Sequence, residues 1–554
     1  MKRKVITIIL SFFSFCVFAQ EALKSIEEEY YQFLSLNGIA DRPALGYRTL
    51  SDSEWKIIEE SHPWKNNNLG TKYILWQGED GKNWFTRGFN HGLKLKIYGP
   101  EWFNSYNTYS PYGQNDGALW QGKGYNSSLT GGARLESYGF EVTIKPSLSF
   151  SQNKSYDYFT SSSMQDSNYL GKASDFGYFW GKVDAPQRFG DSSFWTFDWG
   201  DTEVRWSWYS FTLGFGTQSP WIGPAWLNPV LHSNNAPTYP KFDVGIRKTA
   251  VYLPFCNWYV GDIEGRVWVG RTTESAYFDN DDSNNHNMLH GLSLSYAPSF
   301  LPGLTLGANR ICLSKWKWSN MKFIIPSEDN YVGSDATEGE DQKASFTADW
   351  IFPSIGFEVY GELGFDDGLH FNSIPQHARV YTVGAKKTIT LNKKYDIESE
   401  IIFEWNCTEM SQDFQLQWPY NFGFHHHITQ GYTNKGQWIG AGSGYGGRGF
   451  YLGYRVYHKK GSVLGFFNHW QPDNNFIYSK AVYASAADGS LNKTYIRSWK
   501  TYNTVGLTAN YFFMPSFIGE CSIYHTEIIN SLYAETGTEH TRNFHLEISA
   551  KYNF

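Results

Sequence analysis

A two-residue alternation of apolar and polar side chains runs through most of the chain, from about Thr71 to the last residue. It is unbroken at the C-terminus, where the even-numbered positions from Phe544 to Phe554 are apolar or aromatic and the positions between them are polar. Successive side chains of a β-strand point to opposite faces, so this period predicts strands with one apolar and one polar face. The chain therefore belongs to the all-β class.

Soluble β-sandwiches also alternate, so the pattern alone does not place the chain in a membrane. Two further features favour a membrane barrel. Aromatic residues gather near strand ends on the apolar faces, as the aromatic girdles of outer-membrane barrels require. The last residue, Phe554, closes an amphipathic strand, which is typical of bacterial outer-membrane barrels, whereas so apolar a free terminus would promote aggregation of a soluble protein. Alternation of the same kind occurs at residues 93–97, 140–145, 292–296, 345–352, 397–405 and 504–511.

We therefore predict one closed antiparallel transmembrane β-barrel over residues 70–554. Closure satisfies every backbone donor and acceptor in lipid, which an open sheet cannot do. At about ten residues per strand plus turns and loops, this length corresponds to roughly 16 to 18 strands. The lumen of so wide a barrel is not filled by the side chains of its own strands.

The N-terminus predicts export. Lys2, Arg3 and Lys4 precede an apolar run, and Ala19 marks the cleavage position of a signal peptide at residues 1–19. After it, residues 20–69 contain two helical patterns, one over residues 21–36 and one from the capping-box sequence at residue 51 to about residue 62. We expect a small helical subdomain on the periplasmic side of the outer membrane of a Gram-negative bacterium.

Composition excludes several classes of function. The net charge of −7 without a basic cluster argues against nucleic acid as a partner. The cysteines that remain after cleavage are too sparse for a disulfide framework. These cysteines are Cys256, Cys312, Cys407 and Cys521.

Three segments imitate active or metal sites, but each departs from the pattern it imitates. A GxGxxG run at residues 442–447 precedes a strand where a dinucleotide site needs a helix. His425, His426 and His427 are adjacent, and neighbouring strand residues point apart. The acidic run at residues 279–283 lacks the turn glycine and late glutamate of a calcium loop, which leaves a solvated acidic loop as the preferred interpretation and calcium as the alternative. We predict no catalytic, metal-binding or cofactor-binding residues.

Residues 214–240 carry the densest set of candidate ligand-binding residues. Prolines at positions 220, 224, 229 and 237 stiffen this segment, because each fixes its own backbone angle and restricts the preceding residue. Indole faces beside amide groups suit a sugar ring, which offers C–H faces and hydroxyls. The alternative is that these tryptophans belong to a membrane-interface belt.

Several short segments also resemble those of a known family. These segments are residues 214–216, 220–221, 223–224, 304–310, 357–362, 426–427, 431–432 and 436–440. Together with the export signal and the terminal Phe554, they resemble the capsule assembly protein Wzi family of outer-membrane barrels. The resemblance implies a non-catalytic surface lectin that helps to hold exported capsular polysaccharide on the cell.

We accordingly expect capsular or extracellular polysaccharide and outer-membrane lipid as partners, with the polysaccharide export machinery as a further one and no cofactor. An alternative function is a porin or specific channel for small solutes or saccharides, because a wide barrel has a polar interior. A less favoured alternative is an outer-membrane hydrolase. The residues predicted to bind polysaccharide are Trp221, Trp226, Asn234, Asn235, Tyr432 and Trp438.

Overall fold

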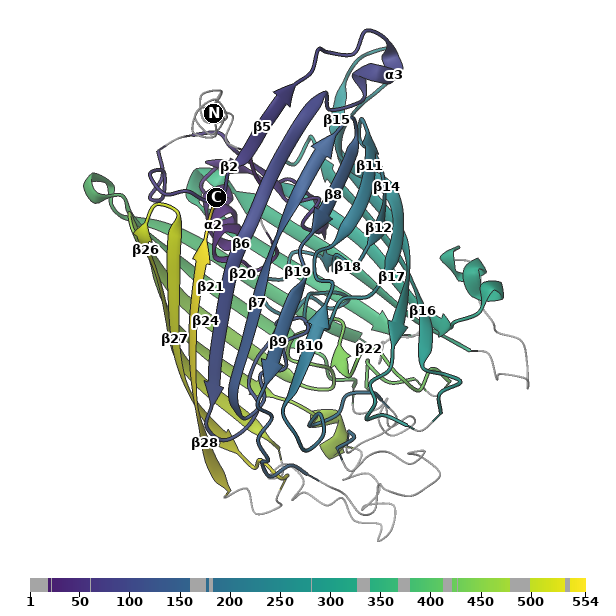
Figure 1. Cartoon of the computed structure of the whole chain (residues 1–554), viewed down its shortest axis with the longest axis vertical. Helices are drawn as coiled ribbons and strands as arrows, with labels where there is room; N and C mark the ends of the chain where they lie inside the picture. Colours follow the sequence, from purple (N-terminus) through teal and green to yellow (C-terminus); the bar gives the residue numbers. More distant parts are fainter. Residues whose placement is uncertain are drawn as a thin grey trace, which may run out of the picture.

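The computed structural model describes residues 18–20, 22–59, 61–159, 176–178, 183–279, 281–325, 339–366, 379–411, 421–425, 427–478, 499–533 and 539–554. Its dominant feature is a closed antiparallel barrel, which confirms the predicted fold class (Figure 1). The barrel has 18 strands. In this count, β8 and β9 form one interrupted strand, and β10 and β11 form another. β5 and β28 also share one place in the wall, because both pair with β6 at different positions along its length.

The first half of the barrel comprises β5 (Lys72–Gln77), β6 (Gly92–Asn107), β7 (Gly124–Ser137), β8 (Phe140–Ile144), β9 (Ser147–Ser151), β10 (Phe194–Asp198), β11 (Glu203–Trp208), β12 (Phe211–Gly216), β14 (Lys241–Tyr252), β15 (Tyr259–Thr273) and β16 (His286–Pro298). The second half comprises β17 (Leu304–Lys315), β18 (Glu340–Phe352), β19 (Phe357–Asp366), β20 (Arg379–Asn392), β21 (Ile397–Cys407), β24 (Arg448–His458), β25 (Gly461–Gln471), β26 (Thr501–Met514), β27 (Phe517–Ile529) and β28 (His540–Tyr552). A short helix, α3 (Trp84–Arg87), lies in the connection between β5 and β6.

The two faces of the strands separate as the alternation predicts. On β8, Phe140 and Ile144 are 56% and 54% exposed, whereas Glu141 and Thr143 are 9% and 1% exposed. The apolar side chains therefore point outward and the polar ones point into the lumen. An apolar exterior around a closed ladder of hydrogen bonds is the arrangement that a bilayer requires.

The two ends of the barrel differ in their connections. The C-terminus and several two-residue turns, such as Lys459–Lys460, lie at one end, and longer connections such as residues 108–123 lie at the other (Figure 1). Outer-membrane barrels place short turns in the periplasm and long loops outside. The upper end in Figure 1 is thus periplasmic, and the lower end faces the exterior.

The N-terminal segment, residues 18–71, folds inside the periplasmic half of the lumen. One predicted helix is confirmed as α2 (Ile26–Leu36), with Ser25 as its N-cap. The second predicted helix is wrong, because its residues include β4 (Glu54–Ile57), which pairs with β1 (Phe18–Gln20) and β2 (Ala40–Asp41). The supposed capping residue Ser51 instead donates its hydroxyl hydrogen bond to Glu203 of the barrel, and Trp55 stacks on Tyr31. Most of the predicted signal peptide, residues 1–17, lies outside the described residues.

Ion pairs hold this segment to strands on several sides of the barrel. Each pair joins a residue of the N-terminal segment to an inward-facing residue of a strand. The pairs are Glu27–Lys551, Glu29–Arg455, Arg42–Asp349, Arg42–Glu358, Asp52–Arg247 and Asp52–Arg266. An aromatic cluster adds to them, since Tyr30 and Phe33 pack on Tyr457 of β24. The lumen that the strands alone would leave open is thus filled from within at this end.

No helix among the described residues is long and apolar enough to cross a membrane.

Candidate functional site

After β12 ends at Gly216, residues 217–240 leave the wall and enter the lumen. There β13 (Trp221–Ile222) pairs with β3 (Tyr47–Arg48) of the N-terminal segment, and the backbone N–H of Gly223 donates to the carbonyl of Gly46 at 2.9 Å. Two segments that are far apart in the sequence therefore contact each other inside the barrel, and together they obstruct the lumen.

Two wall carboxylates fix this inward loop. Glu404 of β21 accepts hydrogen bonds from the backbone N–H groups of Trp226, Leu227 and Asn228, the shortest being 2.6 Å. Glu362 of β19 accepts from the N–H groups of Ala225 at 3.0 Å and Val230 at 2.8 Å. Each of these side chains accepts hydrogen bonds from two or more backbone N–H groups, so the loop is positioned by its backbone.

Gly223 shows how closely the loop approaches the wall. Its φ is +90°, and a Cβ atom there would lie 2.2 Å from Glu362 Oε1. Glycine is therefore required at this position for both conformation and space.

A second inward loop packs on the first. It includes β22 (Thr433–Asn434) and β23 (Gln437–Trp438). Tyr432 donates its hydroxyl hydrogen bond to the carbonyl of Leu231 at 2.7 Å, and the side-chain amide of Asn235 donates to the carbonyl of Trp438 at 2.9 Å. An apolar core forms where the two loops meet the wall. Its members include Tyr47, Ile222, Val230, Leu231, Tyr432, Ile439, Trp268, Leu289, Ile311 and Val380.

Two of the predicted polysaccharide-binding residues are buried where the inward loops pack inside the lumen. Trp221 and Tyr432 are both 0% exposed, and the Trp221 indole donates to the carbonyl of Ala225 while Lys24 and Arg48 lie over its ring. The prediction that they lie on an accessible surface is wrong, because the loop turns inward to satisfy its backbone at Glu404 and Glu362.

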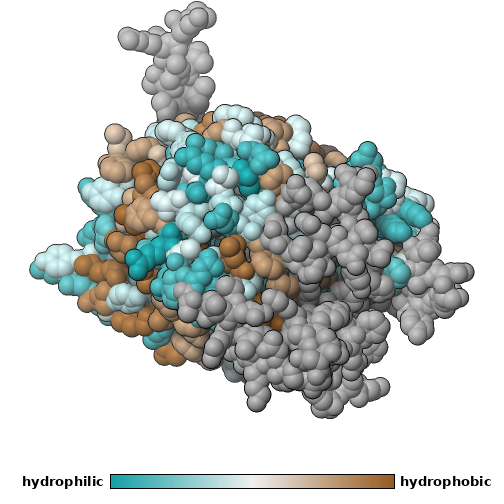
Figure 2. All heavy atoms as spheres, turned by 90° about the horizontal axis from the view of Figure 1, so that it is seen from below, coloured by the Kyte–Doolittle hydropathy of each residue, from teal (hydrophilic) through white to brown (hydrophobic). Residues whose placement is uncertain are grey.

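Trp438 and Asn235 are brought together at one cavity of about 260 Å³, which we call the outer cavity. Its walls come from loop segments at the exterior end that lie far apart in the sequence. Besides these two, they include Tyr109, Trp120, Tyr156, Tyr158, Tyr178, Gln437, Asp473, Lys500, Tyr502 and Tyr533. Seen from this end, the described residues present polar groups over the central face and apolar residues toward one edge (Figure 2).

The outer cavity combines aromatic rings with polar groups. Tyr178 and Tyr533 both donate hydrogen bonds to Asp473, and burial raises the pKa of the Asp473 carboxyl. The indole N–H of Trp120 has no partner within the described part of the chain. Sequence reasoning missed Trp120, Tyr178 and Tyr502, because no local motif marks residues that meet only after folding.

The other two predicted residues lie elsewhere. Trp226 lines a separate cavity deeper in the lumen. Asn234 is half-buried, and its carbonyl accepts from the N–H of Gly117 at 2.9 Å. Neither stands beside Trp438 in the outer cavity.

In the segments that imitate metal sites, the described side chains form hydrogen bonds with nearby residues of the same segment. His425 accepts hydrogen bonds from the backbone N–H groups of His427 and Ile428 through Nδ1, and His426 lies outside the described residues. Asp281 accepts from the N–H and hydroxyl of Ser283. Among the residues that the structure describes, no three His, Cys, Asp or Glu side chains are arranged to hold a metal ion.

Fold and site together define an outer-membrane β-barrel whose lumen is closed by its N-terminal segment and by two inward loops. The family model of the capsule assembly protein Wzi matches residues 112–469, which is more than half of the chain. The protein therefore belongs to the Wzi family, and it resides in the outer membrane of a Gram-negative bacterium.

The chain shares its fold with one of the solved structures that it resembles. The chain is similar to Wzi of Escherichia coli, an outer membrane protein involved in group 1 capsule assembly, with 12% identity and a TM-score of 0.53 over 82% of this chain and 85% of that one. It is also similar to OccAB2 of Acinetobacter baumannii, with 10% identity and a TM-score of 0.39 over 83% of this chain and 98% of that one. No curated protein sequence matches the chain.

The segments that resemble the family's motifs are structural in this chain. Gly223 and Glu362 form the close contact that fixes the inward loop, and Tyr432 ties the second loop to the first. These segments therefore account for the closed lumen, whereas the residues that line the outer cavity lie mostly outside them.

We expect Trp221→Ala to destabilise the protein by about 3 to 5 kcal/mol, because it removes a fully buried indole and leaves a cavity in the closure. The urea midpoint of the purified protein in detergent measures this effect. Trp258→Ala is the matched control, because Trp258 is 74% exposed at a periplasmic turn and should change stability by no more than about 0.5 kcal/mol. Equal effects of the two substitutions would contradict the buried role of Trp221.

Acid should loosen the N-terminal segment through Glu29. Burial raises the pKa of Glu29, but the charges of Arg455 and Lys24 outweigh burial and lower it from 4.5 to about 2. Because the pKa is lower in the folded state, the stabilisation is present above pH 4.5 and is lost as the pH falls toward 2. We expect the urea midpoint to drop over this range, and to drop less in Glu29→Gln. An identical drop in both proteins would rule out Glu29 as a contributor.

Proposed function

We propose that the protein binds exported capsular or other extracellular polysaccharide at its exterior end and helps to hold it on the cell, without a catalytic step. Membership of the Wzi family supports this proposal, as does the fold shared with the Escherichia coli protein, which is described as a carbohydrate-binding β-barrel. The proposal rests on the outer cavity at the exterior end, which is lined by aromatic rings and side-chain amides.

The chemistry of the outer cavity suits a sugar chain. Ring faces such as that of Trp438 stack on sugar C–H faces, and side chains such as Asn235 and Gln437 exchange hydrogen bonds with hydroxyls. Each contact is weak, but a long polymer engages many copies of the barrel and gains avidity. A protein that retains polymer in this way needs no turnover.

The two ends of the barrel suggest how the other partners are arranged. The apolar exterior contacts outer-membrane lipid, and the long loops meet polymer outside the cell. We place contact with the polysaccharide export machinery at the periplasmic end, where the N-terminal segment fills the lumen. The N-terminal segment and the inward loops occupy the lumen in the described part of the chain. This arrangement argues against the alternative function as a channel.

A strain that lacks the gene tests this function. Polymer in the culture medium and polymer on the cells are measured after complementation with the wild type, Trp438→Ala, Trp120→Ala or the control Trp258→Ala. We expect the two cavity variants to release polymer into the medium at normal total yield, and the wild type and Trp258→Ala to retain it. Normal retention in cells that lack the protein altogether would refute the proposal.

A further inference from the structure

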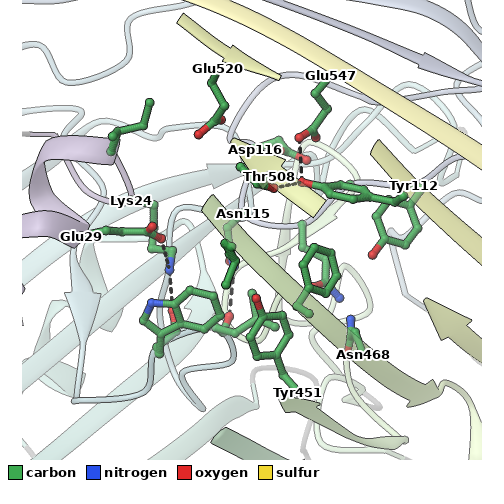
Figure 3. A pocket seen from close by; sticks show the side chains of 18 of the residues that line it. Lys24, Glu29, Tyr112, Asn115, Asp116, Tyr451, Asn468, Thr508, Glu520 and Glu547 are labelled. Carbon is green, nitrogen blue, oxygen red and sulfur yellow. Dashed lines mark hydrogen bonds and ion pairs between the residues drawn. The ribbon is translucent and has the colours of Figure 1, made fainter. Parts of the chain in front are cut away.

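A second cavity, which we call the inner cavity, lies within the lumen and has a volume of about 280 Å³ (Figure 3). It is bounded by the start of the N-terminal segment, by the connection between β6 and β7, and by inward side chains of β24 to β28. Gly113 lines both this cavity and the outer one, so the connection between β6 and β7 separates the two.

Aromatic rings follow one another along the wall of the inner cavity. The ring centroids of Trp226 and Tyr451 are 4.8 Å apart, those of Tyr451 and Phe466 are 5.3 Å apart, and those of Phe466 and Tyr524 are 5.1 Å apart. The series thus extends from the inward loop across β24 and β25 to β27. All four residues line the cavity and give it an extended aromatic face.

The side of the inner cavity that faces Tyr451 is acidic. Figure 3 shows Asp116, Glu520 and Glu547 on one side of the space and Tyr451 and Asn468 on the other. Four carboxyl groups and two cations line the cavity, and one of the carboxylates pairs with both cations: Glu29 lies 3.2 Å from Lys24 Nζ and 2.7 Å from Arg455 Nη2. The cavity therefore has an excess of carboxylates.

Two buried amide oxygens at this cavity lack partners. Asn115 and Gln121 are only 9% and 4% exposed, and Asn115 Oδ1 and Gln121 Oε1 accept no hydrogen bond in the part of the chain that the structure describes. Their amide nitrogens are used, since they donate to the carbonyl of Leu227 and to Asp116. A buried acceptor without a partner is destabilising, and a hydroxyl donor from a ligand would remove that penalty.

We propose that the inner cavity is a second saccharide subsite, which binds a neutral or amino sugar unit and rejects a uronic acid. The aromatic series offers faces for the C–H side of the ring, and the free amide oxygens and carboxylates accept hydrogen bonds from hydroxyl or amino groups. The carboxylate of a uronic acid would meet Glu547, and both cations that line the cavity are already paired with Glu29. This inference rests on the proposed polysaccharide-binding function and adds a sugar class to it.

Calorimetry on the purified barrel in detergent tests the subsite with four probes: glucose, glucosamine, N-acetylglucosamine and glucuronic acid. We expect at least one of the first three to bind the wild type and glucuronic acid not to bind. Asn468→Phe fills the inner cavity and should weaken this binding by about tenfold or more, which corresponds to about 1.4 kcal/mol. Trp258→Ala, at an exposed periplasmic turn, should leave it unchanged.

Glu547→Gln keeps the volume of the side chain and removes its charge, so it should reduce the difference in affinity between glucuronic acid and the other sugars. Binding of glucuronic acid to the wild type as tight as that of the other sugars would overturn the proposal. So would an Asn468→Phe barrel that is folded, as judged by circular dichroism, and binds like the wild type. If none of the four sugars binds while the strain's own polysaccharide does, the subsite fails and the proposed function stands; if the polysaccharide also fails to bind, the function itself is refuted.

Discussion

Asp52→Lys is expected to convert an electrically silent barrel into a conducting one. Asp52 is 7% exposed and lies 2.8 Å from Arg247 and 3.1 Å from Arg266, two cations on neighbouring strands of the wall. A lysine there would bury a third positive charge beside them. Breaking a buried ion pair costs about 3 to 5 kcal/mol, and like-charge repulsion adds to this cost. The N-terminal segment should then leave the lumen.

Single-channel recording in planar bilayers measures this change. The wild type should pass little current, and Asp52→Lys should show discrete open steps. Asp41→Lys is the matched control, because Asp41 lies in the same segment and is exposed. Large conductance in the wild type would show that the segment does not close the lumen, and it would restore the channel alternative.

Glu404→Ala should release the inward loop at residues 217–240. The substitution leaves the N–H groups of Trp226, Leu227 and Asn228 without their shared acceptor in a buried site. Each buried donor without a partner costs about 1 to 3 kcal/mol, so a loss of at least about 3 kcal/mol is expected. The loop should become accessible to protease in the purified barrel, and the urea midpoint should fall.

Glu398→Ala provides the comparison, because Glu398 lies on the same strand and is only half-buried. It should leave both protease resistance and the urea midpoint close to those of the wild type. If Glu404→Ala behaved like Glu398→Ala, the carboxylate would not be what positions the loop.

The alternation predicted the barrel well, because lipid on one side and polar contacts on the other impose opposite demands on successive residues. Phe140 and Glu141 illustrate this, as the first points outward and the second forms an ion pair with Arg247 inside. The helix at α2 was predictable for a similar reason, since its capping serine and apolar face are local signals. The strand at Glu54–Ile57 was not, because its partners are distant in sequence.

The candidate site was predicted only in part. Tryptophans and prolines between residues 214 and 240 indicated a shaped loop, but nothing in that segment reveals that Glu362 and Glu404 would draw it into the lumen. Trp221 is therefore buried inside the lumen, whereas Trp438 and Asn235 line the outer cavity. Which aromatic residue is accessible depends on contacts between loops that only the folded barrel brings together.

Binding of the strain's own purified surface polysaccharide to the purified barrel is the most direct test of the central claim. The polysaccharide is immobilised, and the wild type, Trp438→Ala and Trp258→Ala are compared by biolayer interferometry. We predict saturable binding by the wild type and by Trp258→Ala, and binding weakened by about tenfold or more in Trp438→Ala, as expected for loss of an aromatic residue central to an interface. Equal binding by all three proteins, or none by the wild type, would contradict the assignment of the outer cavity as the site that holds polysaccharide.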